Sequence, residues 1–297
     1  MTTTTQLHAL TPEQIAFWEE NGFLLVPGLV SPDEVAAIRD HFMAMQREAQ
    51  RSDSPLRDKY APLTPQQSGG DVLKEFPRVM HPHNWDELSM RQMLDARVQN
   101  VLRDLFGEEP LAAQSMFYFK PMGARGQALH QDNFYLNVRP GTCIAAWLAV
   151  DDADEENGGM SVVPGSHKLG VQCPGMADMN QSFTTEEVAV PQGYEAVPAR
   201  MKAGDVLFFN GSMIHGSTPN VSRDRFRRAF ICHYVGNSTV GMNGGYYPLH
   251  DFDGTKITRE WVEGQLNTCG AEDWATYQQL RSAWEKEHLQ ASGAGIH

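Results

Sequence analysis

Three residues of types that bind transition metals stand out in the sequence. His130 and Asp132 are two positions apart, and His215 comes shortly after the apolar run 205–209. On an extended strand the side chains at positions i and i+2 project to the same face, so His130 and Asp132 can bind one metal ion together. Two imidazoles and one carboxylate form the ligand set that suits non-haem Fe(II) and leaves coordination positions open. We therefore predict a metal site formed by His130, Asp132 and His215.

The other histidines are weaker candidates for metal binding. His167 lies in a Pro-Gly-Ser-His-Lys segment and His233 in an Ile-Cys-His-Tyr segment. We interpret them as a turn residue and a core residue. His81 and His83 flank a proline and could line a pocket, but neither has a carboxylate at ligand spacing.

A group of arginines follows the third predicted ligand. Arg225, Arg227 and Arg228 precede an apolar segment that reads as a strand. A guanidinium is planar and always charged, and it can hold a carboxylate through two parallel hydrogen bonds. An arginine at the start of this strand is therefore a candidate for binding an organic acid near the metal.

In this order, the motifs resemble those of the phytanoyl-CoA dioxygenase family of Fe(II)- and 2-oxoglutarate-dependent oxygenases. The resemblance covers about residues 12 to 240, and the combination is more specific than any single motif. The matching segments are 130–132, Trp147, 157–168, 204–206, 215–217 and 227–229.

The resemblance implies Fe(II) at the three predicted ligands, with 2-oxoglutarate and O2 as co-substrates. Arg227 matches the arginine that binds the distal carboxylate of 2-oxoglutarate, and Ser217 matches a hydroxyl beside it. His215 and Arg227 are 12 residues apart, one more than the resemblance leads us to expect, which implies a one-residue insertion in the preceding turn. Arg225 and Arg228 are interpreted as solvated or ion-paired surface residues. Further co-substrate contacts are implied for Gln114, Met116 and Trp147.

The implied reaction is hydroxylation of an unactivated C–H bond with release of succinate and CO2. Asp132 retains the carboxylate that related halogenases replace with a small residue, so halogenation is disfavoured. We expect the substrate to be a small metabolite or natural-product intermediate. Coenzyme A thioesters are disfavoured because the acidic chain has no evident basic strip for their phosphates. The candidate substrate contacts are Phe134, Tyr135, Asn137, Arg78 and His81; for Phe134 and Tyr135, packing in the core is an equal alternative.

Two other functions are compatible with parts of the pattern. One is a catalytically inactive jelly-roll protein that binds a small molecule, and the other is a metal-dependent hydrolase with zinc at the same triad. The intact triad together with Arg227 argues against the first. No positioned acid or base beside the triad supports the second, in which Arg227 would have no role.

A series of short strands is predicted to hold these residues in place. Between Leu111 and Val235 the chain alternates short apolar runs with Gly, Pro and Asn, which is typical of a β-sandwich or barrel with helices packed outside. The resemblance implies a mainly β fold with flanking helices around a double-stranded β-helix, a cupin-like jelly roll. The predicted strands are 114–120, 128–138, 142–150, 160–163, 205–209 and 228–235. The irregular stretch 172–201 is interpreted as an insertion at the active site.

The flanking segments complete one predicted oxygenase domain over residues 1–297. Capping residues Thr11 and Ser31, each followed by proline, predict helices that end near residues 21 and 50, with a strand at 23–26 between them. A helical period predicts one helix over 90–106. We expect N-terminal helices, a short strand and a lid loop in 1–110, the jelly-roll core in 111–240 with the insertion 172–201, and a helical segment in 241–290. The lid loop is placed at 51–70, and the tail 291–297 is expected to be disordered.

The overall charge narrows the possible partners. The chain has 297 residues, with 24 Lys and Arg against 37 Asp and Glu and a net charge of −13. So acidic a chain would repel phosphate backbones, which excludes an electrostatically driven nucleic-acid binder. No apolar run is long enough to span a membrane. We expect a cytoplasmic protein that acts on a small molecule, and the sequence leaves its oligomeric state open.

The acidic stretch 151–156 does not have the spacing of an EF-hand loop and is interpreted as an exposed turn.

Overall fold

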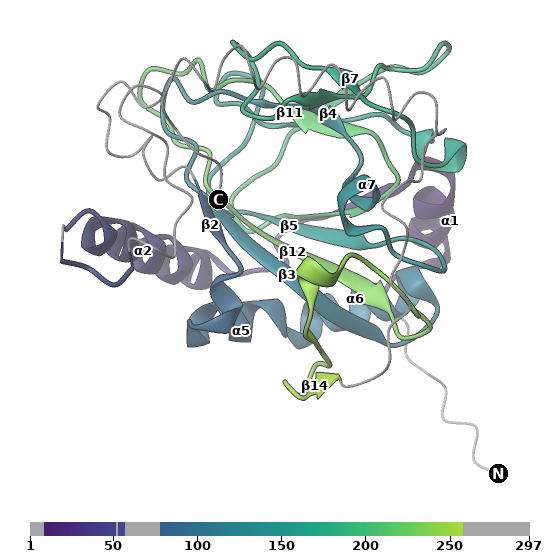
Figure 1. Ribbon diagram of the computed structural model, residues 1–297, viewed down its shortest axis with the longest axis horizontal. Coiled ribbons are helices and arrows are strands. Elements are labelled where there is room, and N and C mark those ends of the chain that lie inside the picture. The colour runs from purple at the N-terminus through teal and green to yellow at the C-terminus, as the bar shows by residue number, and fades with distance from the viewer. Residues whose placement is uncertain (1–8, 52, 57–77, 258–297) are drawn as a thin grey trace.

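The computed structural model describes residues 9–51, 53–56 and 78–257 (Figure 1). Most of the predicted lid loop 51–70 lies outside these residues. The same is true of the predicted C-terminal helical segment from residue 258 onward and of the tail 291–297.

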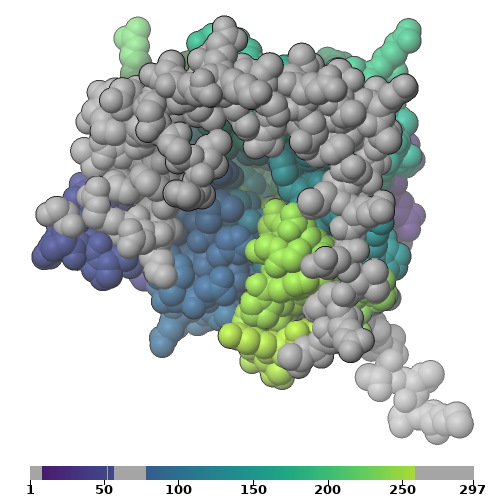
Figure 2. Space-filling model, viewed as in Figure 1, coloured from purple at the N-terminus to yellow at the C-terminus, as the bar shows by residue number. Residues whose placement is uncertain are grey.

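A large antiparallel sheet forms the base of the fold. Its strand order is β1-β10-β5-β12-β3-β13-β14, and β2 also pairs with β3. In Figure 2 the yellow-green segment that ends the described chain lies beside the blue segment that contains β2 and β3, and β13 pairs His250 with Ala112 of β3. The strands of this sheet are β1 (Phe23–Val26), β2 (Arg78–Met80), β3 (Pro110–Tyr118), β5 (Ile144–Ala149), β10 (Val206–Asn210), β12 (Ala229–Gly236), β13 (Leu249–His250) and β14 (Lys256–Ile257).

A smaller sheet faces the large one and completes a two-layer sandwich (Figure 1). Its order is β4-β11-β6-β9, and the short strands β7 and β8 pair separately. This arrangement confirms the predicted jelly-roll fold. The strands of the smaller sheet are β4 (Gln127–His130), β6 (Met160–Val162), β9 (Val197–Ala199) and β11 (His215–Ser217), and the separate pair is β7 (Gly175–Met176) with β8 (Glu186–Glu187).

Helices cover the outer side of the large sheet (Figure 1). Thr11 and Ser31 cap the first two helices with reciprocal capping boxes, as predicted. The predicted single helix over 90–106 is two helices, because Asp95 caps a new helix by accepting a hydrogen bond from the Arg97 backbone N–H. The helices are α1 (Pro12–Asn21), α2 (Pro32–Ala49), α5 (Glu87–Met93) and α6 (Ala96–Phe106), with short 3₁₀ turns η2 (Pro82–Asn84), η3 (Ser166–Leu169) and η4 (Gly244–Tyr246). Among the helices described, none is both long and apolar enough to cross a bilayer.

The two faces of the large sheet have different neighbours. Because side chains alternate along a strand, each strand contributes to both faces. The β5 residues in the cluster that packs against the helices are Ile144, Ala146 and Leu148. The β5 residues in the cluster between the two sheets are Ala145, Trp147 and Ala149. The inner face therefore lies toward the predicted metal ligands.

Two predicted segments differ from the structure. The predicted strand 128–138 ends at His130, and Asp132 begins a short helix, α7 (Asp132–Leu136). This helix forms because the Asn133 backbone N–H donates to the Gly211 carbonyl instead of a neighbouring strand, and Asn137 ends it in the left-handed conformation. The stretch 172–201 is also less irregular than predicted, since it contains β7, β8 and β9 and β9 completes the small sheet beside β6.

Candidate active site

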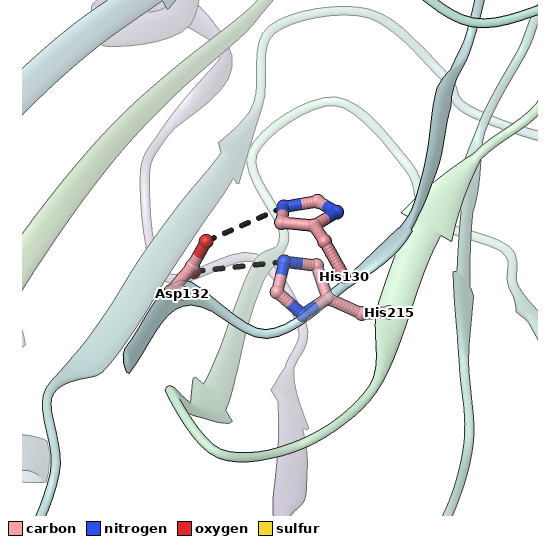
Figure 3. A group of neighbouring side chains, drawn as sticks. All are labelled: His130, Asp132 and His215. Atoms are coloured by element: carbon pink, nitrogen blue, oxygen red, sulfur yellow. Dashed lines mark ion pairs between the residues drawn. The ribbon is translucent and has the colours of Figure 1, made fainter. Parts of the chain in front are cut away.

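The three predicted metal ligands come together between the two sheets. Antiparallel pairing of β4 with β11 sets His130 directly opposite His215, and their ring centroids are 4.3 Å apart. Asp132, the first residue of α7, points toward both rings (Figure 3). One ligand atom of each residue lies within 4.8 Å of the others. All three side chains are largely shielded from solvent.

The turn between His130 and Asp132 is fixed by Gln131. Its fully buried side-chain amide donates to the carbonyls of Ser212 and Gly170, and its carbonyl oxygen accepts from the Gln172 backbone N–H at 2.7 Å. The ligand pair is therefore brought together by an anchored turn, not by strand alternation through Asp132 as the sequence suggested.

Both histidines have a hydrogen bond that orients the ring for metal binding. The Nδ1 atoms of His130 and His215 lie 2.8 and 3.0 Å from the carbonyls of Ala128 and Met213. A carbonyl oxygen can only accept, so each Nδ1 carries a proton and each Nε2 is the ring nitrogen that faces the metal position. These Nε2 atoms lie 3.4 and 3.5 Å from the Asp132 carboxylate oxygens. Burial lowers the pKa of His215 to about 4, so its ring is neutral at pH 7. The donor set fits a divalent cation.

Asp132 has a further partner that the sequence analysis did not identify. Its Oδ2 accepts a hydrogen bond from His233 Nε2 at 2.8 Å. Burial by itself raises the pKa of Asp132, but the neighbouring histidines, His215 first, hold it well below its usual range. The interpretation of His233 as a core residue was incomplete, because its buried ring also orients the carboxylate. Ala229 and Ile231 face the inner side of the large sheet, so alternation along β12 was the signal that could have identified His233.

A cavity of about 250 Å³ opens onto the triad. Its lining includes the predicted ligands and all five residues predicted to contact the co-substrate. Those five are Gln114, Met116, Trp147, Ser217 and Arg227.

Arg227 differs from its neighbouring arginines in its surroundings. Its side chain is buried, with Nε donating to the Gly158 carbonyl at 3.0 Å and the guanidinium carbon 5.1 Å from the centre of the Trp147 ring. Burial lowers the pKa of Arg227 to about 10, which leaves it cationic at pH 7. Arg225 and Arg228 instead form ion pairs with Asp154 and Asp151, each at 2.7 Å, outside the cavity lining. Of the three arginines, Arg227 alone faces the cavity.

Sequence comparison places the chain among known proteins. The sequence model described as "Phytanoyl-CoA dioxygenase (PhyH)" matches residues 18–229. The chain belongs to this family. It is 28% identical over 239 residues to phytanoyl-CoA dioxygenase 1 of Oryza sativa subsp. japonica, an alignment that covers 72% of this chain and 85% of the plant protein. The family assignment confirms the predicted enzyme class, a non-haem Fe(II)- and 2-oxoglutarate-dependent oxygenase.

Solved structures share the fold at lower sequence identity. EctD from S. alaskensis, solved with 2-oxoglutarate and 5-hydroxyectoine, has a TM-score of 0.63 and 20% identity, covering 90% of this chain and 91% of that one. The epimerase SnoN, solved with Fe3+, alpha ketoglutarate and nogalamycin RO, has a TM-score of 0.59 and 20% identity, covering 84% of this chain and 96% of SnoN. These likenesses support the fold assignment.

In this phytanoyl-CoA dioxygenase family member, Lys120 is a second buried cation that the sequence analysis left without a role. Its Nζ donates to the Gly158 carbonyl at 2.9 Å, to Ser217 Oγ at 3.0 Å and to the Thr218 carbonyl. These three hydrogen bonds match the three N–H bonds of an ammonium group, although burial and then Arg227 lower the pKa of Lys120 well below its usual range. A lysine closing a buried strand before proline was the available signal.

Lys120 also fixes the direction of the Ser217 hydroxyl. Ser217 Oγ accepts from Lys120 Nζ and from the Gln127 backbone N–H at 3.2 Å. With both lone pairs occupied, its O–H is left to donate to a further acceptor. Within the described part of the chain, no carboxylate lies within 4 Å of Lys120 or Arg227. The two buried cations and this hydroxyl together suit an anionic ligand.

The predicted substrate contacts differ in whether they line the cavity. Arg78 and Tyr135 line the cavity. Phe134, Asn137 and His81, the other predicted substrate contacts, are not part of its lining. Phe134 lies in α7 and Asn137 ends it, and the ring centroid of His81 lies 6.1 Å from that of Tyr246.

Proposed function

We propose that this protein hydroxylates an unactivated C–H bond of a small molecule and consumes 2-oxoglutarate. The overall reaction converts substrate, 2-oxoglutarate and O2 into hydroxylated substrate, succinate and CO2. The observation that carries the proposal is the shared cavity, in which a buried His-Asp-His triad and the buried Arg227 face the same space. A buried cation without a carboxylate partner is costly, and an anionic co-substrate would offset that cost.

His130, Asp132 and His215 would hold the metal. Fe(II) bound there would supply coordination positions for the 2-oxo acid end of 2-oxoglutarate and for O2, and so the oxidising power of the reaction. The chain's own contribution is to hold each imidazole with its Nδ1–H turned away from the metal position and to keep the carboxylate ionised. The backbone carbonyls behind the two rings and His233 behind Asp132 serve that purpose.

Arg227 and Ser217 would bind the distal carboxylate of 2-oxoglutarate. The Arg227 nitrogens not engaged by Gly158 can donate to its oxygens, and the Ser217 hydroxyl is oriented to add a third donor. Trp147 packs against the Arg227 guanidinium, and Met116 adds an apolar wall. These contacts would fix the direction in which the co-substrate enters the metal site and exclude water around it.

The carboxylate of the triad disfavours halogenation, and hydroxylation is the primary reaction that we propose in its place. Asp132 is an intact and oriented carboxylate, so the position that a halide would need is occupied by the protein. EctD, with its bound hydroxylated ectoine, supports hydroxylation as an outcome on this fold. SnoN is an epimerase, so a reaction assay must follow the oxidised product as well as succinate.

The direct test is an anaerobic titration of the Fe(II)-loaded protein with 2-oxoglutarate, followed by the visible charge-transfer absorption of the chelate. We expect saturable absorption in the wild-type protein. Arg227→Met should raise the 2-oxoglutarate Kd about 30-fold to 150-fold, because it removes charge-assisted hydrogen bonds worth about 2 to 3 kcal/mol.

The matched control is Arg225→Met, which removes an arginine two residues away that pairs with Asp154. We expect a Kd within about threefold of the wild-type value, since such ion pairs contribute little. Equal effects of the two substitutions would contradict the role of Arg227. Asp132→Ala should lose Fe(II) retention in metal analysis, and absence of the absorption in wild-type protein with iron bound would favour an inactive binding protein.

A further inference from the structure

A second arginine lies in the same cavity, away from the group around Arg227. Arg78 begins β2, where its partner across the strand pair is Tyr118 of β3. Its Nη1 donates to the Tyr118 hydroxyl at 3.2 Å. The guanidinium carbon lies 5.5 Å from the centre of the Phe183 ring and 5.9 Å from that of Tyr118. Two aromatic rings thus hold the cation at the cavity wall.

Arg78 has no acidic partner among the residues that the structure describes. Several other arginines pair with carboxylates, as Arg97 does with Glu34 and Arg225 with Asp154. The side chain is half-buried, and none of its nitrogens belongs to the buried polar atoms without a hydrogen-bond partner. Its remaining N–H groups are therefore open to the cavity and not sealed against apolar atoms. A guanidinium in this setting presents a fork that fits a carboxylate.

The surroundings of Arg78 connect it with the metal site. Tyr135 lines the cavity beside it, and the Tyr135 ring is 6.2 Å from that of His130. Tyr246 also lines the cavity and is close enough to interact electrostatically with both Asp132 and Arg78. A ligand held by Arg78 would therefore extend toward the triad. The cavity lining also includes the apolar Met80, Met116 and Leu136 and the polar Gln114, Thr184 and Glu186.

The two arginines can serve different ligands. Arg227 is enclosed with Lys120 and Ser217, a group suited to the distal carboxylate of 2-oxoglutarate. Arg78 stands on another strand, with aromatic and apolar neighbours. We propose that Arg78 binds a carboxylate of the primary substrate, so that the substrate is a small carboxylic acid whose apolar body lies over the triad. This inference rests on the proposed function, because it assigns the second ligand of the same cavity.

The proposal can be tested with octanoate as a probe carboxylate and octanamide as its uncharged match. The protein is loaded with Zn(II), which is redox-inert, and saturating 2-oxoglutarate, and ligand binding is followed by saturation-transfer NMR titration. We expect octanoate to bind at least about tenfold more tightly than octanamide, which corresponds to about 1.4 kcal/mol. Arg78→Met should remove this preference, and Arg78→Lys should retain part of it.

Several results would overturn the proposal. Equal binding of octanoate and octanamide, no binding of octanoate, or an unchanged preference in Arg78→Met would each show that Arg78 does not select a carboxylate. Octanoyl-coenzyme A that binds more tightly than octanoate, regardless of Arg78, would assign a thioester substrate.

Two measurements separate this inference from the proposed function. The Kd of 2-oxoglutarate should be unchanged in Arg78→Met; a rise of about tenfold or more would make Arg78 a co-substrate contact. Octanoate should not compete with 2-oxoglutarate, since competition would assign the acid to Arg227. Arg225→Met is the matched control, and thermal unfolding of each variant shows whether it is folded.

Discussion

The charged residues of the site are distinguished by what surrounds each of them. Arg225 and Arg228 form ion pairs outside the cavity, whereas Arg227 and Lys120 are buried and share the Gly158 carbonyl. Buried charges are costly unless hydrogen bonds and a counter-charge compensate them. We therefore expect a site with two such cations to bind an anion of matching shape, with each cation contributing to the affinity.

Lys120→Met tests this contribution at the scale of one residue. The change removes one positive charge and the donor to Ser217 Oγ, which then no longer has both lone pairs occupied. We expect the Kd of 2-oxoglutarate, measured by the same anaerobic titration, to rise about tenfold or more. Fe(II) affinity should stay near the wild-type value, because Lys120 does not contact the triad.

The matched control is Lys202→Met, which removes an exposed lysine paired with Asp152. It should leave the 2-oxoglutarate Kd unchanged. If Lys120→Met lowers the thermal unfolding temperature but leaves the Kd unchanged, Lys120 has only a structural role.

The turn before β12 sets the direction of Arg227. Asn220, which is fully buried, donates from Nδ2 to the carbonyls of Lys120 at 3.1 Å and Arg225 at 2.8 Å. The Lys120 carbonyl also accepts from the Arg227 backbone N–H. The neighbouring acidic turn is paired and not merely solvated as predicted, because Asp154 and Glu156 bind Arg225. The turn that contains Asn220 and the acidic turn that contains Asp154 thus contact one another and hold Arg227, the predicted co-substrate arginine, in place.

Asn220→Ala should weaken this brace. It leaves two backbone carbonyls without the amide donors, at a cost of about 2 to 4 kcal/mol in the free energy of unfolding. We also expect a higher Kd for 2-oxoglutarate, because Arg227 loses its fixed direction. Thermal unfolding and the anaerobic titration measure the two effects. Asn180→Ala, at an exposed position in another loop, is the control, and an Asn220→Ala protein with wild-type values in both measurements would contradict the role of the turn.

Across the whole molecule, the residues that pack against the helices and the residues that line the cavity lie on opposite faces of the large sheet. The outer face packs against the helices, where Phe42 of α2 stacks on Phe117 of β3 with ring centroids 4.0 Å apart. The inner face contributes Trp147 and Ile231 to the cavity. A change on the outer face should therefore affect folding with little effect on co-substrate binding.

Phe42→Ala tests this separation. Removing a fully buried aromatic ring costs about 3 to 5 kcal/mol and should lower the thermal unfolding temperature by about 5 to 10 °C. At low temperature, where the variant stays folded, the Kd of 2-oxoglutarate should equal the wild-type value. Phe17→Ala, at a side chain 43% exposed, is the control with little expected change in either measurement. A large Kd change without a stability change would show that the two faces are coupled.

The amino-acid sequence by itself determined the ligand types and most of the strands. Metal chemistry depends on residue types in a short motif, and an apolar alternation is a local property of the chain. Together with the motifs at Trp147, 157–168 and 204–206, the order of these ligands and of Arg227 predicted the family and the jelly roll. The helix caps at Thr11 and Ser31 were predictable for the same reason, because capping involves residues within one turn.

Only the tertiary structure decided the residues that act through distant partners. His233 meets Asp132 across 101 residues of sequence, and Lys120 meets Ser217 across 97. The helix at Asp132 likewise depends on the carbonyl of Gly211, far along the chain, where the local pattern predicted a strand. Such contacts depend on how the strands pair, and no local periodicity encodes that pairing. The types of the metal ligands could thus be predicted from the sequence. The residues that orient those ligands were decided by the fold.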